Sequence, residues 1–193
     1  MARKKQEFRP DTFRADILGK LLLTKKQSLQ LLRWVLFCTV CLVALLLQDV
    51  VMSRFTIYGS TTDLVPCCIL AICILQGAES GCIFALVASL VYYFSGSAPG
   101  IFVIPILTVI AVLTAIFRQA YLRKGFSTLL LCTAVALLVY ELCTFFIGLF
   151  LGLTLWSRFP VFLTATALTL VLMPVLYPIL LSIGKIGGET WKE

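Results

Sequence analysis

The chain has 193 residues, of which 61% are hydrophobic and only 13% are charged, and it carries a net charge of +7. Soluble domains average about 45–50% apolar and about 25% charged residues, so this composition excludes a mainly water-facing surface and indicates an integral membrane protein. The positive charge does not indicate nucleic-acid binding, because nine of the 16 Lys and Arg residues precede Trp34 and lie beside the first hydrophobic segment.

We expect the first 33 residues to form a basic cytoplasmic tail and residues 184–193 to form a second, short cytoplasmic tail. Within the first tail, apolar residues between about 11 and 25 recur at helical spacing, with charged side chains on the other face. A basic amphipathic helix next to a membrane span is expected to lie on an anionic leaflet. The alternative is a plain tail without contact to lipid.

Residues 34–183 predict one all-α integral membrane domain, a bundle of six transmembrane helices. A helix needs about 20 apolar residues, with a tolerated range of about 17–25, to cross about 30 Å of hydrocarbon. Turn-forming residues separate six apolar segments, which run over about 32–52, 62–76, 80–94, 101–117, 128–151 and 160–183.

The second and third segments are short enough to form a re-entrant hairpin instead of two full spans. In that arrangement Glu79 would lie near the middle of the membrane, where a charge costs about 2.5–3.5 kcal/mol. We therefore expect two spans, with Glu79 in a cytoplasmic turn between them.

The distribution of basic residues predicts that both termini are cytoplasmic. With the N-terminus inside, the inner tails and turns contain 14 of the 16 Lys and Arg residues, and the outer loops contain only Arg54 and Arg158. This asymmetry follows the positive-inside rule. The expected location is the plasma membrane.

Two acidic residues in apolar sequence are the main candidates for a functional site. Asp63 opens the second segment, where a carboxylate is expected to cap free N–H groups. Glu141 lies about midway along the fifth segment and is the only charged residue between Gly125 and Ser157. A carboxyl group at that depth belongs either to a functional site or to a buried structural network, and the sequence leaves both open.

The sequence contains no residue set typical of catalysis or metal binding, since it has no His, no phosphate-binding Gly loop and no metal-ligand spacing. We therefore expect no enzyme activity, no cofactor and no metal. The eight cysteines lie in apolar segments and are expected to pack as small apolar residues. Gly77-x-x-x-Gly81 and Gly148-x-x-x-Gly152 predict close helix contacts, within the chain or between chains.

Several short motifs follow one another in an order found in a known family. YGSTTDLVPCCIL (58–70) opens the second segment, QGAESGCIFALVASLVYYFSGSAPG (76–100) ends in a Ser-Gly-x-x-x-Gly turn, and a Tyr-Glu pair lies in the fifth segment. With these motifs, residues 34–183 resemble MreD, the bacterial rod-shape-determining membrane protein family. Thr62 stands where that family usually has Pro, and Tyr92 where many members have Asp. The residues that carry the resemblance are Gly59, Asp63, Leu64, Gly77, Gly81, Ser95, Gly96, Pro99, Gly100, Tyr140 and Glu141.

The resemblance implies a scaffold of the cell-elongation machinery that is not a catalyst. Such a protein would lie in the bilayer and link MreC and MreB to the wall-building enzymes RodA and a class B penicillin-binding protein. The implied fold is similar to the six-helix substrate-binding components of energy-coupling-factor transporters. The candidates for interaction or structural roles are Asp63, Glu79, Gly96, Pro99, Gly100, Tyr140 and Glu141.

The similarity of folds gives the main alternative, a small-molecule-binding subunit of a vitamin or metal uptake transporter. Such a subunit is expected to have polar and aromatic groups that converge on an outward-facing pocket. The predicted spans contain few polar groups apart from Glu141 and several Tyr residues, which favours the scaffold. A protein that handles lipids through its Pro-kinked helices is a third hypothesis.

Overall fold

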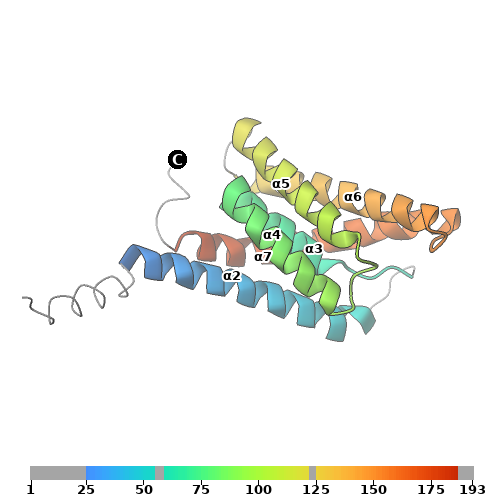
Figure 1. The fold of residues 1–193 in the computed structure, drawn as a ribbon, viewed down its shortest axis with the longest axis horizontal. Helices are drawn as coiled ribbons and strands as arrows, with labels where there is room; N and C mark the ends of the chain where they lie inside the picture. The colour runs from blue at the N-terminus through green and yellow to red at the C-terminus, as the bar shows by residue number, and fades with distance from the viewer. Residues whose placement is uncertain (1–24, 55–58, 122–124, 187–193) are drawn as a thin grey trace, which may run out of the picture.

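The computed structural model describes residues 25–54, 59–121 and 125–186, and this part of the chain is all-α (Figure 1). Two short 3-10 turns, at Met52–Arg54 and Trp156–Arg158, follow α2 and precede α7. The predicted amphipathic helix at about 11–25 lies almost entirely outside the described residues. The α-helices are α2 (Lys25–Val50), α3 (Leu64–Gln76), α4 (Ala78–Phe94), α5 (Val103–Tyr121), α6 (Phe126–Phe150) and α7 (Phe159–Gly184).

Consecutive helices run in opposite directions, so the bundle has two ends (Figure 1). One end contains the start of α2, the turn between α3 and α4, the end of α5 and the end of α7. We call it the basic end, because Arg33, Arg118 and Lys185 lie on it. We call the other the opposite end. It contains the end of α2, the start of α3 and the start of α7, with Arg54 and Arg158.

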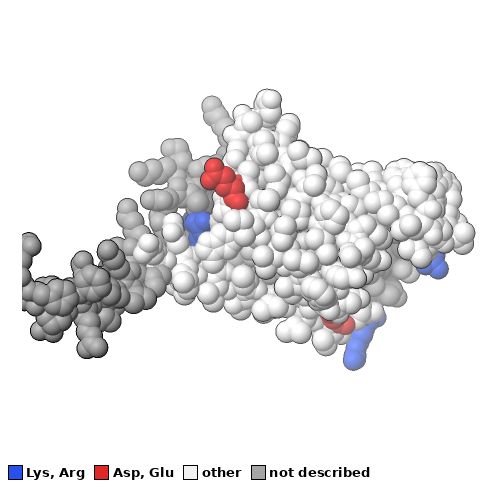
Figure 2. Space-filling model, viewed as in Figure 1, with Lys and Arg blue, Asp and Glu red and all other residues white. Residues whose placement is uncertain are grey.

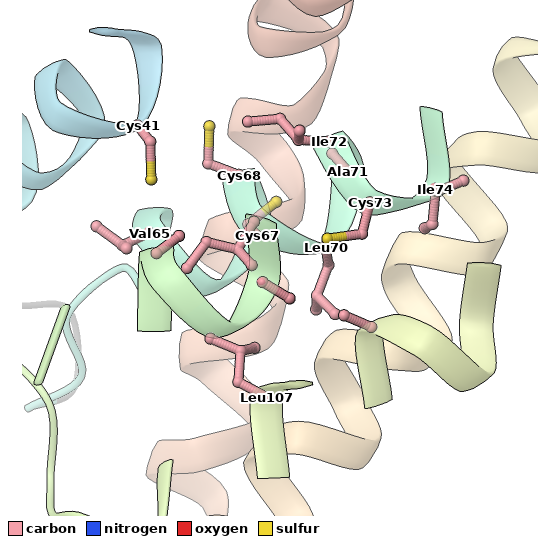
Figure 3. Packing of buried hydrophobic residues seen from close by; sticks show 14 of the residues in the cluster. Cys41, Val65, Cys67, Cys68, Leu70, Ala71, Ile72, Cys73, Ile74 and Leu107 are labelled. Carbon is pink, nitrogen blue, oxygen red and sulfur yellow. The ribbon is translucent and has the colours of Figure 1, made fainter. Parts of the chain in front are cut away.

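The short helix α3 is the centre of the bundle, and it packs against all five other helices. Every residue from Leu64 to Leu75 is buried. A helix that is apolar all round is stable only when it is covered on all sides, and here α2, α4, α5, α6 and α7 provide that cover (Figure 3). At 13 residues, α3 is about 20 Å long, well short of the roughly 30 Å of a hydrocarbon core.

The thiols on α3 contribute to this packing. Cys73 donates a hydrogen bond from Sγ to the carbonyl oxygen of Gly81 on α4, at 3.1 Å, and the Sγ of Cys67 lies 3.8 Å from the Sδ of Met173 on α7. All eight cysteines of the chain are free thiols. Five of them are buried and serve as small packing residues, whereas Cys82 and Cys143 are half-buried and Cys38 is exposed.

A single residue, Gly77, separates α3 from α4, whereas the sequence predicts a turn over residues 76–80. Gly77 adopts φ +93°, a left-handed conformation that lets the chain reverse within one residue. Glu79 is consequently not in a loop. It lies exposed in the first turn of α4, where a carboxylate is favoured by the helix dipole.

Arginine side chains hold the end of α3 at the basic end of the bundle. Nη1 of Arg118, which is buried, donates to the carbonyl oxygen of Ile74 at 2.6 Å. Nη2 of Arg33 donates to Oε1 of Gln76. Positive charge at a helix C-terminus satisfies free carbonyl groups and complements the dipole, so these contacts fix α3 to α2 and α5.

Four helical stretches are long and apolar enough to cross a membrane: Gln27–Arg54, Val103–Tyr121, Phe126–Phe150 and Trp156–Gly184. The side of the bundle shown in Figure 2 is almost free of charge between its two ends. Leu46, Ile83, Leu113 and Val171 are among the many large apolar side chains that point outward. The fold is thus an all-α, membrane-type bundle in which α3 and α4 are the shorter members.

Candidate functional site

The candidate site lies where the chain enters α3, at the opposite end of the bundle. Residues 59–63 are not helical, yet Ser60 and Thr62 are buried. Because α3 is short, this non-helical segment extends inward between the longer helices. In hydrocarbon, irregular backbone is tolerated only where protein or a water-filled cavity satisfies its polar groups.

Side chains from two other helices satisfy the start of α3. Oε1 of Gln48 on α2 accepts from the backbone N–H of Val65 at 2.9 Å. Oγ1 of Thr169 on α7 accepts from the backbone N–H of Asp63 at 2.9 Å. The sequence predicts that the Asp63 side chain caps this helix, and that prediction is wrong. Asp63 occupies the N-cap position, but its side chain makes no capping hydrogen bond.

The Asp63 carboxyl group instead lies beside the carboxyl group of Glu141 on α6, close enough for the two groups to interact, and both line the same cavity. Two ionised carboxylates are both acceptors and repel one another, so their proximity disfavours two negative charges at this site. Glu141 is only 4% exposed, and its Oε1 atom has no hydrogen-bond partner. No basic side chain in the described part of the chain interacts with either carboxyl group.

A small cavity of about 170 Å³ opens beside the acidic pair. One wall is polar and consists of the segment Gly59–Thr61 together with Asp63 and Glu141. The facing wall is apolar and belongs to the first turns of α7, and it consists of Val161, Phe162 and Ala165. The cavity therefore combines an acidic side with a hydrophobic side.

Two tyrosines extend the polar layer into the bundle. Tyr140 precedes Glu141 on α6, is 1% exposed, and lies close enough to Asp63 and Glu141 to interact with them electrostatically. The hydroxyl of Tyr92 on α4 accepts a long hydrogen bond, 3.5 Å, from Nε2 of Gln48. The same glutamine thus links the start of α3 to α4, which makes the layer continuous across the bundle.

The other sequence-predicted residues lie outside this cavity. Glu79 is at the basic end. Gly96, with φ +80°, ends α4 by donating from its N–H to the carbonyl oxygen of Tyr93 at 3.1 Å. Pro99 and Gly100 follow in the connection to α5, and a Cβ atom at Gly100 would clash with the ring of Phe102. These residues shape the connection and do not line the cavity.

Sequence reasoning missed Gln48 and Thr169. Both are buried polar side chains, at 8% and 0% exposure, in otherwise apolar helices. An amide in the run LLLQDV is the one signal that sequence offers for Gln48, since a buried amide requires partners. Thr169 has no such signal, because a threonine in a helix can bond its own backbone, as Thr169 also does with Ala165 at 2.7 Å.

The chemistry of the site is that of an acidic acceptor. Within the described ranges, no group of three or more His, Cys, Asp or Glu side chains is arranged to hold a metal ion. The pair can accept hydrogen bonds from a cationic group or exchange a proton. No known protein family matches this chain, and no curated protein or solved structure is significantly similar to it.

Proposed function

We propose that this protein is a non-catalytic scaffold of the cell-elongation machinery, embedded in the plasma membrane. Its partners would be MreC and MreB, and through them RodA and a class B penicillin-binding protein. The proposal rests on the resemblance of residues 34–183 to the MreD family. The observation that carries it is the acidic pair of Asp63 and the buried Glu141, which belongs to two of the motifs on which that resemblance depends.

The distribution of charge supports an orientation for this scaffold. The basic end would face the cytoplasm, because Arg33, Arg118 and Lys185 lie there and the strongly basic first 24 residues precede α2. The cavity would then open toward the outside of the cell. In the MreD family, MreC is the partner that faces outward, so this end is the one expected to receive it.

The experiment is recovery of the complex in mild detergent. A tagged chain is purified from its own host, and MreC is quantified in the eluate. Glu141→Leu removes the carboxyl group whose Oε1 atom has no hydrogen-bond partner and keeps the helix apolar, so insertion should be unchanged. Loss of one side of a buried charged contact costs about 2–5 kcal/mol, so recovery of MreC should fall about tenfold or more.

Glu79→Leu is the matched control. It makes the same substitution at an exposed carboxylate on the basic end, so the recovery of MreC should stay at the wild-type level. Normal cell shape together with an unchanged yield of complex in Glu141→Leu would contradict the proposal. The same would follow if the wild-type chain brought down no MreC.

The cavity also supports a second candidate, the small-molecule-binding subunit of an uptake transporter. At about 170 Å³ it is smaller than the roughly 300–1,000 Å³ of pockets that enclose a vitamin-sized ligand, which favours the scaffold. ATPase subunits in the eluate, or a tightly bound small molecule identified by mass spectrometry, would favour the transporter.

A further inference from the structure

We propose that the cavity beside Asp63 and Glu141 is a binding site for one guanidinium group, presented from the opposite end of the bundle. This inference deepens the proposed function, because it assigns a ligand chemistry to the same site. Its first test does not depend on the identity of any partner protein.

The first argument is an unsatisfied acceptor. Glu141 lines the cavity, is more than nine-tenths buried, and has one carboxyl oxygen without a hydrogen-bond partner. A buried polar atom without a partner is destabilising, and a carboxyl oxygen that lines a cavity can be satisfied by a ligand. The missing partner must be a donor that reaches the cavity.

The second argument is charge. Burial beside one another disfavours negative charge on both carboxyl groups, and a bound cation would stabilise their ionised form. The exposed Arg158 at the start of α7 does not supply that cation, since neither carboxyl group interacts with it. A cation from outside this chain is therefore the complement that the pair lacks.

The third argument is shape. Two neighbouring carboxyl groups present several acceptor oxygens side by side, which match the planar fork of a guanidinium better than a point-like ammonium. Val161 and Phe162 on the facing wall can cover the methylene stem that carries such a group, and an aromatic ring also attracts a cation. A bare metal ion would need more oxygen ligands than this cavity gathers.

The test is thermal unfolding of the purified protein in detergent, with n-propylguanidinium chloride as the probe and sodium chloride at equal ionic strength as the reference. At 20 mM probe we expect the melting temperature to rise by about 4 °C or more and to saturate. n-Butylammonium should raise it by less than half as much. Glu141→Gln keeps the side-chain volume but removes the charge, and it should abolish the shift.

Asp49→Asn is the control variant. Asp49 is an exposed carboxylate at the same end and accepts a hydrogen bond from Ser97 at 2.6 Å, outside the cavity. This variant should respond to the probe as the wild type does. An equal shift in Glu141→Gln, an equal response to the ammonium probe, or no shift in the wild type would each overturn the proposal.

A second measurement, the recovery of MreC with the Glu141→Gln variant, distinguishes a guanidinium group on a partner protein from a small free cation. If Glu141→Gln loses both the response to the probe and the recovery of MreC, the guanidinium comes from a partner's arginine. If it loses the response but keeps MreC, the ligand is a small free cation. In that case the proposal of a guanidinium-binding site is supported, and the proposal that Glu141 contributes to binding MreC is contradicted.

Discussion

Gly81→Val tests whether the packing of α3 against α4 limits the stability of the bundle. A Cβ atom at Gly81 would lie 3.1 Å from both the Cα and the carbonyl oxygen of Cys73 on α3. Both atoms are backbone, so a side-chain rotation cannot relieve the contact, and the two helices must separate. Overpacking of this kind costs about 1–3 kcal/mol, and the two extra methyl groups of Val place it at about 2–3 kcal/mol.

For a chain of this size, 1 kcal/mol corresponds to about 2–4 °C, so the melting temperature should fall by about 4–12 °C. The assay is a thiol-reactive fluorescent dye during heating. Cys67, Cys68 and Cys73 are fully buried on α3 and become reactive only when the bundle opens, whereas the exposed Cys38 gives the baseline.

The control is Ala167→Val, which adds the same β-branched side chain on the exposed face of α7. It should melt within about 1–2 °C of the wild type, because surface substitutions change stability by only about 0.5 kcal/mol. If Gly81→Val has the same melting temperature as Ala167→Val, the close contact between α3 and α4 is refuted.

Two further predictions concern the start of α3 and the orientation of the chain. Gln48→Leu leaves the buried N–H of Val65 without its acceptor, so the protein should lose about 1–3 kcal/mol, measured by the same dye assay; an unchanged melting curve would argue against this cap. Deletion of residues 1–25 should preserve insertion with the N-terminus inside, because Lys26 and Arg33 remain in the N-terminal part of α2. Accessibility of a new N-terminal cysteine to an impermeant reagent measures this, and labelling from outside intact cells would contradict it.

The sequence by itself determined that the chain is helical and where its helices lie. Long apolar runs with few charges leave the backbone no partner except its own carbonyl groups, so each run forms a helix. The predicted segments and the observed helices agree closely at most boundaries. The main difference is α2, which begins at Lys25 and not near 32, because basic and amide residues continue a helix as readily as leucine does.

The sequence also singled out Asp63 and Glu141 as candidates, but it could not predict that the two side chains lie next to each other. They are separated by 78 positions, and their contact depends on how deep α3 starts and on the rotation of α6 about its axis. Tertiary packing decided both, since Gln48 and Thr169 satisfy the start of α3 and thereby release the Asp63 side chain from the capping role. Local spacing fixes which residues share a helix face, whereas the depth and rotation of each helix follow from its packing against its neighbours.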